Sequence, residues 1–235
     1  MLEEMGGNRS GIQTNPEHAR EQMEGALAAG PDPEGGPELA HAERAVYINE
    51  GFPVGSLPSL PVAAEGTADE ETTGMAVFLD KLSERLAFER MGTRLYDALI
   101  NKCETLGEET SSGPTLADLQ EIRDEEHRHF LLLNDAVTGL GGDPTVESPC
   151  ADVAAVASMG IMQVVVDPRT TVTQCLNAML TAELTDNAGW EMLIDLAEEL
   201  GHSDLAEQFT QALENEQRHL LNVQSWLSDS VMAQV

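Results

Sequence analysis

The stretch Glu125-Glu126-His127-Arg128-His129-Phe130-Leu131 decides the fold, because its pattern returns 90 positions later as Asn215-Glu216-Gln217-Arg218-His219-Leu220-Leu221. Both copies contain Glu-x-Arg-His followed by two apolar residues. Within each copy the Glu and the His are three residues apart, which places both side chains on one face of a helix. An internal repeat of this kind predicts two similar helical units.

Each copy is preceded by a glutamate in an apolar setting. Glu89 ends the string Leu-Ala-Phe-Glu, and Glu183 ends the string Leu-Thr-Ala-Glu 94 positions later. Tyr96 and Trp190 lie seven residues after these two glutamates, so the match continues along the helix. Glu89 lies on the apolar stripe of its helix, and we expect both glutamates to point inward.

The spacing of apolar residues, with the positions of Gly and Pro, predicts an all-α fold. Four long helices are expected at about 76–107, 115–139, 170–200 and 203–228, with Thr115 and Ser203 as N-caps. Short loops make the first and last pairs antiparallel hairpins. The long connection from about 142 to 169 includes an apolar piece, 151–162, that we expect to lie as a short helix across the bundle. One long crossover between two hairpins is the ferritin-like form of the four-helix bundle.

Four glutamates and two histidines should therefore face the interior of the bundle. Buried carboxylates lose their hydration, and four together would be very costly unless cations balance them. Two divalent cations would cancel four negative charges and leave the histidines neutral. One Glu from each of two helices with a Glu-x-x-His from each of the other two is the ligand set of di-iron and di-manganese bundles, and this donor set favours Fe or Mn. The six predicted metal ligands are Glu89, Glu126, His129, Glu183, Glu216 and His219.

With these motifs, residues 77–230 resemble the ferritin-like superfamily, which includes rubrerythrins, bacterioferritins and di-iron oxygenases. The resemblance implies two iron ions, with manganese as an alternative. It also implies reaction with O2 or H2O2, as a rubrerythrin-like peroxidase or oxidase or as a ferroxidase, with an unknown electron donor. The oxygenases of this type carry Asp-Glu-x-Arg-His, in which the Asp orients a ligand histidine. This chain has Glu125 and Asn215 at the two Asp positions and keeps Arg128 and Arg218, so a monooxygenase is the least expected outcome.

Three further positions near the expected metals bear on the chemistry. Asp186, three residues after Glu183, could be an additional ligand as in rubrerythrins, or equally a solvated side chain; its counterpart after Glu89 is Gly92. We interpret Tyr96 as packing beside the metal ligands rather than as a radical carrier, and His127 as a surface residue.

Two other functions remain open. Iron storage requires a cage, and ferritin cages usually use a fifth short helix, whereas this sequence ends at Val235 soon after the fourth. A non-catalytic metal-binding or scaffold protein is the other alternative. The string Val54-Gly55-Ser56-Leu57 resembles the docking peptides of encapsulin cargo proteins, so an encapsulated cargo is also considered.

Composition sets the remaining expectations. The 235 residues carry 42 acidic and 12 basic side chains, a net charge of -30, which excludes nucleic-acid binding through the general surface. The three cysteines include no C-x-x-C pair, and we expect reduced thiols in a cytoplasmic protein. No signal peptide or membrane-spanning stretch is apparent. We expect a Gly/Pro-rich extension at 1–75, with helical stretches at 16–29 and 38–49, a bundle at 76–235, and a homodimer or higher homo-oligomer.

Overall fold

The structure is a computed structural model that describes residues 16–30, 36–51, 70–107 and 113–235. These residues form seven helices and no strand. The chain divides into two units, 1–52 and 53–235, which are described separately. The first unit contains α2 (Pro16–Ala29) and α3 (Pro37–Glu50), which confirm the two predicted short helices. The Val-Gly-Ser-Leu string at 54–57 lies outside the described residues.

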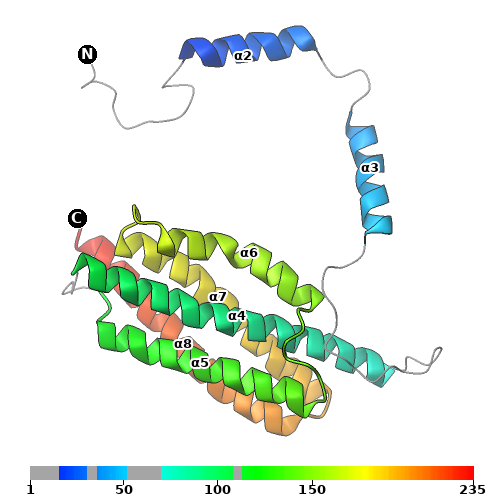
Figure 1. Cartoon of the computed structure of the whole chain (residues 1–235), viewed down its shortest axis with the longest axis vertical. Helices are drawn as coiled ribbons and strands as arrows, with labels where there is room; N and C mark the ends of the chain where they lie inside the picture. The colour runs from blue at the N-terminus through cyan, green and yellow to red at the C-terminus, as the bar shows by residue number, and fades with distance from the viewer. Residues whose placement is uncertain (1–15, 31–35, 52–69, 108–112) are drawn as a thin grey trace. The chain divides into compact units, whose positions relative to one another are not determined.

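Five helices make up the second unit. They are α4 (Glu70–Leu106), α5 (Leu116–Gly139), α6 (Pro149–Val166), α7 (Val172–Glu199) and α8 (Ser203–Met232). Helix α4 packs against α5 and α7, and α8 packs against α7 and α5, so these four long helices run side by side (Figure 1). Four predicted helices are thus confirmed, although α4 begins six residues earlier than expected and α8 ends four residues later.

The helix starts follow local hydrogen bonding. Thr115 is the N-cap of α5 as predicted, and its hydroxyl accepts a hydrogen bond from the Asp118 backbone N–H at 3.1 Å. The prediction of Ser203 as an N-cap is wrong. Gly201, at φ 77°, turns the chain sharply after α7, so the cap position falls on His202, whose side chain makes no capping hydrogen bond. The His202 ring instead stacks on Phe78, with ring centroids 5.7 Å apart.

Two apolar clusters fill the interior of the second unit. One is built around Leu99 and Met179, and the other around Leu82 and Phe209. Along α5, α7 and α8 the buried Glu, Asp and His residues lie between the segments that supply these two clusters, and on α4 Glu89 lies close to the boundary between them. The apolar layers thus enclose a polar layer and shield it from water.

Helix α6 occupies the long connection, which confirms the helix predicted there. It is 18 residues long rather than short, and it runs along α4 and α7 instead of across the bundle (Figure 1). Within the described residues it is the one helix long and apolar enough to cross a membrane by length and composition alone. This finding differs from the expectation that the sequence contains no stretch able to span a membrane. Val153 and Val156 are exposed on its outer side.

Candidate metal centre

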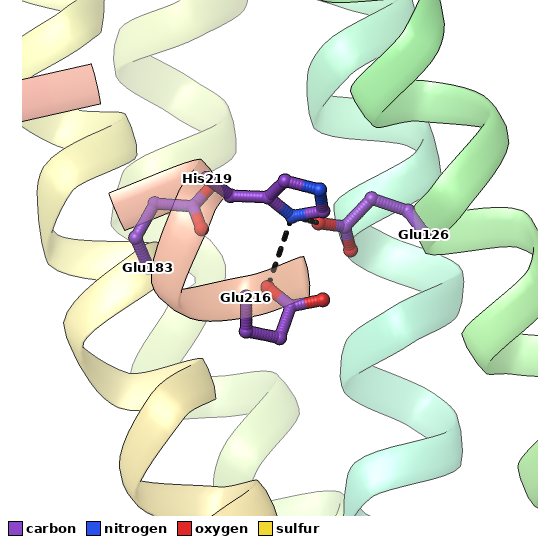
Figure 2. A group of neighbouring side chains, drawn as sticks. All are labelled: Glu126, Glu183, Glu216 and His219. Carbon is purple, nitrogen blue, oxygen red and sulfur yellow. Dashed lines mark hydrogen bonds and ion pairs between the residues drawn. The ribbon is translucent and has the colours of Figure 1, made fainter. Parts of the chain in front are cut away.

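The six predicted ligands come together in the polar layer. Each of their side chains is at most 4% exposed. Glu89 comes from α4, Glu126 and His129 from α5, Glu183 from α7, and the remaining two from α8. Figure 2 shows four of them converging from three helices, with the His219 ring between the carboxylates of Glu126 and Glu216.

The donor atoms fall into three overlapping groups. Glu126, Glu183, Glu216 and His219 offer donors within 4.8 Å of one another, and we name this group the His219 half-site. Glu89, His129 and Glu216 form a second such group, which we name the His129 half-site. A third group joins Glu89, Glu126 and Glu216 to Asp186. Glu216 belongs to all three groups, so it lies between the two half-sites.

Several donor atoms in this layer are buried without a hydrogen-bond partner. One carboxylate oxygen of each of the four glutamates is in this condition, and so is Nδ1 of His129. Buried polar atoms in folded proteins are nearly always satisfied, and exceptions require an explanation. Two of these atoms, Glu216 Oε1 and His129 Nδ1, lie 2.6 Å apart without the geometry of a hydrogen bond. The other three are carboxylate oxygens with no hydrogen-bond partner, and such oxygens are suited to bind cations. The unsatisfied atoms are Glu89 Oε2, Glu126 Oε2, Glu183 Oε2, Glu216 Oε1 and His129 Nδ1.

Both histidines present Nδ1 to the carboxylates. His129 Nδ1 lies 2.6 Å from Glu216 Oε1, and His219 Nδ1 lies 3.1 Å from Glu216 Oε2 and 3.4 Å from Glu126 Oε1. Their Nε2 atoms face away, toward Asn215 and Glu125 respectively. Nδ1 is therefore the nitrogen of each ring available to a metal ion.

Tyr96 and Trp190 cross between the two hairpins. The Tyr96 hydroxyl on α4 donates a hydrogen bond to Glu183 on α7. Trp190 Nε1 on α7 donates to Glu89 Oε1 on α4 at 2.9 Å. Both aromatic residues are fully buried. Each holds the glutamate that lies outside the Glu-x-x-His pairs, which we name the outer glutamate, in the opposite hairpin. The interpretation of Tyr96 as packing beside the metal ligands agrees with this geometry, which leaves Glu89 Oε2 and Glu183 Oε2 without a hydrogen bond.

Asp186 is not a solvated side chain. It is 2% exposed and forms an ion pair with the buried Arg85, whose Nη1 lies 2.6 Å from Asp186 Oδ1. The Arg85 guanidinium also lies 4.0 Å from the Phe88 ring centroid and donates to the Asp186 backbone carbonyl at 3.0 Å. Sequence reasoning missed Arg85. Its signal was its position four residues before Glu89, on the inward side of α4.

Two glycines make room for these groups. A Cβ at Gly189 would lie 2.3 Å from Arg85 Nη1, and a Cβ at Gly92 would lie 2.1 Å from Glu126 Oε2. Gly92 is the counterpart of Asp186 in the repeat. The asymmetry between these positions therefore has a physical cause. On α4, Gly92 leaves space for the Glu126 carboxylate, whereas α7 contributes the carboxylate of Asp186 at the equivalent position.

We expect Gly92→Ala to reduce the metal content after reconstitution to one ion per chain or less, because the new methyl group displaces the Glu126 carboxylate. Gly160→Ala is the matched control, since a Cβ there meets no atom within 4 Å and α6 contributes no donor. Metal analysis of the desalted proteins measures the effect. Two ions retained in Gly92→Ala would contradict the assignment of Glu126 as a ligand.

Glu125, Arg128 and Arg218 lie just outside the six residues. Glu125 is buried and accepts a hydrogen bond from His219 Nε2 at 2.7 Å, and Arg218 Nη2 lies 2.5 Å from each of its oxygens. The hydrogen bond with His219 is the main reason that the pKa of Glu125 falls to about 2. Arg128 is largely exposed and approaches Glu125 at 3.5 Å, while His127 is exposed as predicted. The carboxylate thus orients the histidine of the opposite hairpin.

Burial dominates the electrostatics of the carboxylates. It raises the pKa of Glu89, Glu183 and Asp186 well above the ordinary range, and neighbouring carboxylates add to the rise. The pKa of Glu126 is raised for the same two reasons. Burial acts on Glu216 as well, but close contacts with both histidine rings lower its pKa to about 2. Without cations, the layer therefore holds protons on some of its carboxyl groups.

We expect the metal-free protein to lose stability as the pH rises from about 5 to 8. Above the ordinary pKa of 4.5 the unfolded chain releases the protons of Glu89 and Glu183, whereas the folded chain retains them. A folded state that binds more protons loses about 1 kcal/mol per pH unit for each extra proton. Urea unfolding of metal-depleted protein at several pH values tests this. A free energy of unfolding that increases with pH over this window would contradict it.

No family model, curated protein or solved structure matches this chain. The structure therefore supports, from the chain's own residues, an all-helical protein with a buried Glu/His cluster that could hold metal ions.

Proposed function

We propose that the protein is a ferritin-like di-iron oxidoreductase, with manganese as an alternative metal, that reduces H2O2 or O2. The observation that carries this proposal is the buried layer of four glutamates and two histidines, in which three carboxylate oxygens, Glu89 Oε2, Glu126 Oε2 and Glu183 Oε2, have no hydrogen-bond partner. The order of helices also supports a ferritin-like bundle, since α5 and α7 are joined by a long connection that includes α6, whereas the other connections are short.

The charges in the polar layer support two divalent ions. Four glutamates and Asp186 would carry five negative charges when ionised, and the buried Arg85 cancels one of them. Glu125 is offset separately by Arg218. Two divalent cations would balance the remaining four charges with the histidines neutral. This balance would offset the cost of burying the carboxylates.

When bound, two ferrous ions would supply the two electrons that convert one H2O2 and two protons into two water molecules. The chain's part is to hold the ligands in place and to exclude bulk water. Tyr96 and Trp190 hold the outer glutamates, and Glu125 orients the His219 ring. The two apolar clusters shield the layer from water on two sides. An external donor would have to return the electrons for turnover.

Metal analysis followed by stopped-flow oxidation tests the proposal. Protein reconstituted with Fe²⁺ or Mn²⁺ without oxygen should retain two ions per chain after desalting. The diferrous form should consume one H2O2 per two irons, within the dead time or a few seconds. Fewer than about one metal per chain would overturn the proposal.

The same experiment separates the other functions. A storage protein would sediment as a large shell and take up many irons per chain. A scaffold would bind metal without consuming oxidant. Either result would replace the oxidoreductase proposal while leaving the metal site intact.

A further inference from the structure

The two histidines of the metal centre have different partners on their outward nitrogen. His219 Nε2 faces a carboxylate oxygen of Glu125 at 2.7 Å, whereas His129 Nε2 faces the amide nitrogen of Asn215 at 3.4 Å. Glu125 and Asn215 occupy equivalent positions in the repeat, one residue before a ligand glutamate. The difference therefore distinguishes two otherwise similar half-sites.

The Glu125 contact favours metal binding at His219. A carboxylate only accepts hydrogen bonds, so it keeps the proton on Nε2 and leaves Nδ1 directed at Glu126 and Glu216. Glu125 is itself fixed by Arg218, at 2.5 Å from both of its oxygens. Outer partners of this kind raise the basicity of a ligand histidine, and their loss costs about 10- to 100-fold in metal affinity.

The Asn215 contact does not preorganise His129 in this way. An amide can offer either its oxygen or its nitrogen, so it does not fix which ring nitrogen carries the proton. Asn215 presents its amide nitrogen, a donor, to Nε2 of His129. This contact suits a His129 ring that carries its proton on Nδ1 and leaves Nε2 unprotonated. A metal ion at Nδ1 of His129 would require the amide to turn over.

The surroundings of the two histidines differ as well. A mainly polar cavity of about 420 Å³ opens between α5 and α8, and its walls include His129, Asn215, Arg128 and Gln211. His219 is fully buried and does not line this cavity. Of the six predicted ligands, only His129 lines this cavity, and Glu89 and Glu216 of its half-site lie behind it. An ion would therefore enter or leave the His129 half-site past the His129 ring, without passing the His219 half-site.

We propose that the two half-sites have separate roles: the His219 half-site retains its metal ion, and the His129 half-site exchanges its ion through the cavity between α5 and α8. This inference rests on the proposed two-metal centre. It identifies Glu125 as a positioning residue for the retained ion and Asn215 as the residue that keeps the other ion exchangeable.

Chelator challenge of protein loaded with two Co²⁺ ions per chain tests the proposal, with visible absorption as the readout. We expect two phases of equal amplitude whose rates differ at least 10-fold. Glu125→Gln should accelerate only the slow phase, by about 10- to 100-fold. Asn215→Asp should slow only the fast phase, because it gives His129 a carboxylate partner.

Two controls match these variants in charge. Asp135→Asn removes one charge from α5 at an exposed position. Gln211→Glu adds one charge to the cavity wall one turn before Asn215. We expect neither control to change the ratio of the two rates. Circular dichroism verifies that each variant is folded.

The outcomes distinguish this inference from the proposed function. Fewer than about one bound ion per chain in the unaltered protein would overturn both, and a single bound ion would overturn only the division of roles. Two ions that leave in a single phase would overturn only the division of roles. An equal effect of Asn215→Asp on both phases would do the same, and this variant keeps the test decisive if Glu125→Gln does not fold.

Discussion

The double variant Glu89→Gln/Glu183→Gln should be less stable than the unaltered protein when metal is bound and more stable than it when metal is absent. Each substitution removes one carboxylate from one half-site while keeping the size of the side chain. In the presence of metal the unaltered protein should be the more stable of the two. At a free metal concentration 1,000 times Kd, each bound ion contributes about 4 kcal/mol, or about 8 kcal/mol for two. The variant should lose most of this and retain less than one ion per chain.

In chelating buffer at pH 8 the order should invert. Burial raises the pKa of Glu89 and Glu183, which means that their ionised forms are unfavourable in the folded chain. Neutral amides remove that cost and can still accept hydrogen bonds from Trp190 and Tyr96. Urea unfolding with and without metal measures both arms. The control Glu104→Gln/Glu191→Gln changes the net charge equally at exposed positions of the same two helices. The expectation would be wrong if, without metal, the free energy of unfolding of the variant were no greater than that of the unaltered protein.

The sequence repeat predicted the buried cluster because it constrains both halves of the bundle together. A Glu-x-x-His pair on a helix defines one face, and its recurrence 90 residues later defines a second face of the same kind. Glu89 and Glu183 could be added because they interrupt apolar stripes, where an unpaired charge would be costly. The structure brings all of these side chains into one buried layer.

The sequence did not predict which residues from distant parts of the chain contact one another. Arg85 and Asp186 are 101 residues apart, and no repeat relates them, because Gly92 replaces the acidic residue in the first hairpin. The sequence indicated that Glu125 could contact one of the two histidines, but not which one, because its own helix carries His129. Only the packing of α5 against α8 shows that it contacts His219 rather than His129.

Arg85→Met should be the most destabilising single substitution near the centre. Removing one partner of a buried ion pair typically costs about 3–5 kcal/mol, because the other charge is left uncompensated. Here the partner is Asp186, which already lies beside the carboxylates of Glu89, Glu126 and Glu216. The methionine side chain keeps most of the volume and the packing against Phe88. We therefore expect the loss to come from charge rather than from a cavity.

The double variant Arg85→Met/Asp186→Asn should recover most of that loss, because it removes both charges together. A double-mutant cycle in urea, with metal depleted, isolates the coupling between the two residues. We expect a coupling energy of at least about 2 kcal/mol. The double variant should also still bind two metal ions, since the pair is neutral as a unit and the six ligands are unchanged. Additive losses would show that Arg85 does not compensate Asp186. Loss of one ion in the double variant would instead make Asp186 a ligand, and the charge balance of the centre would then have to be assigned again.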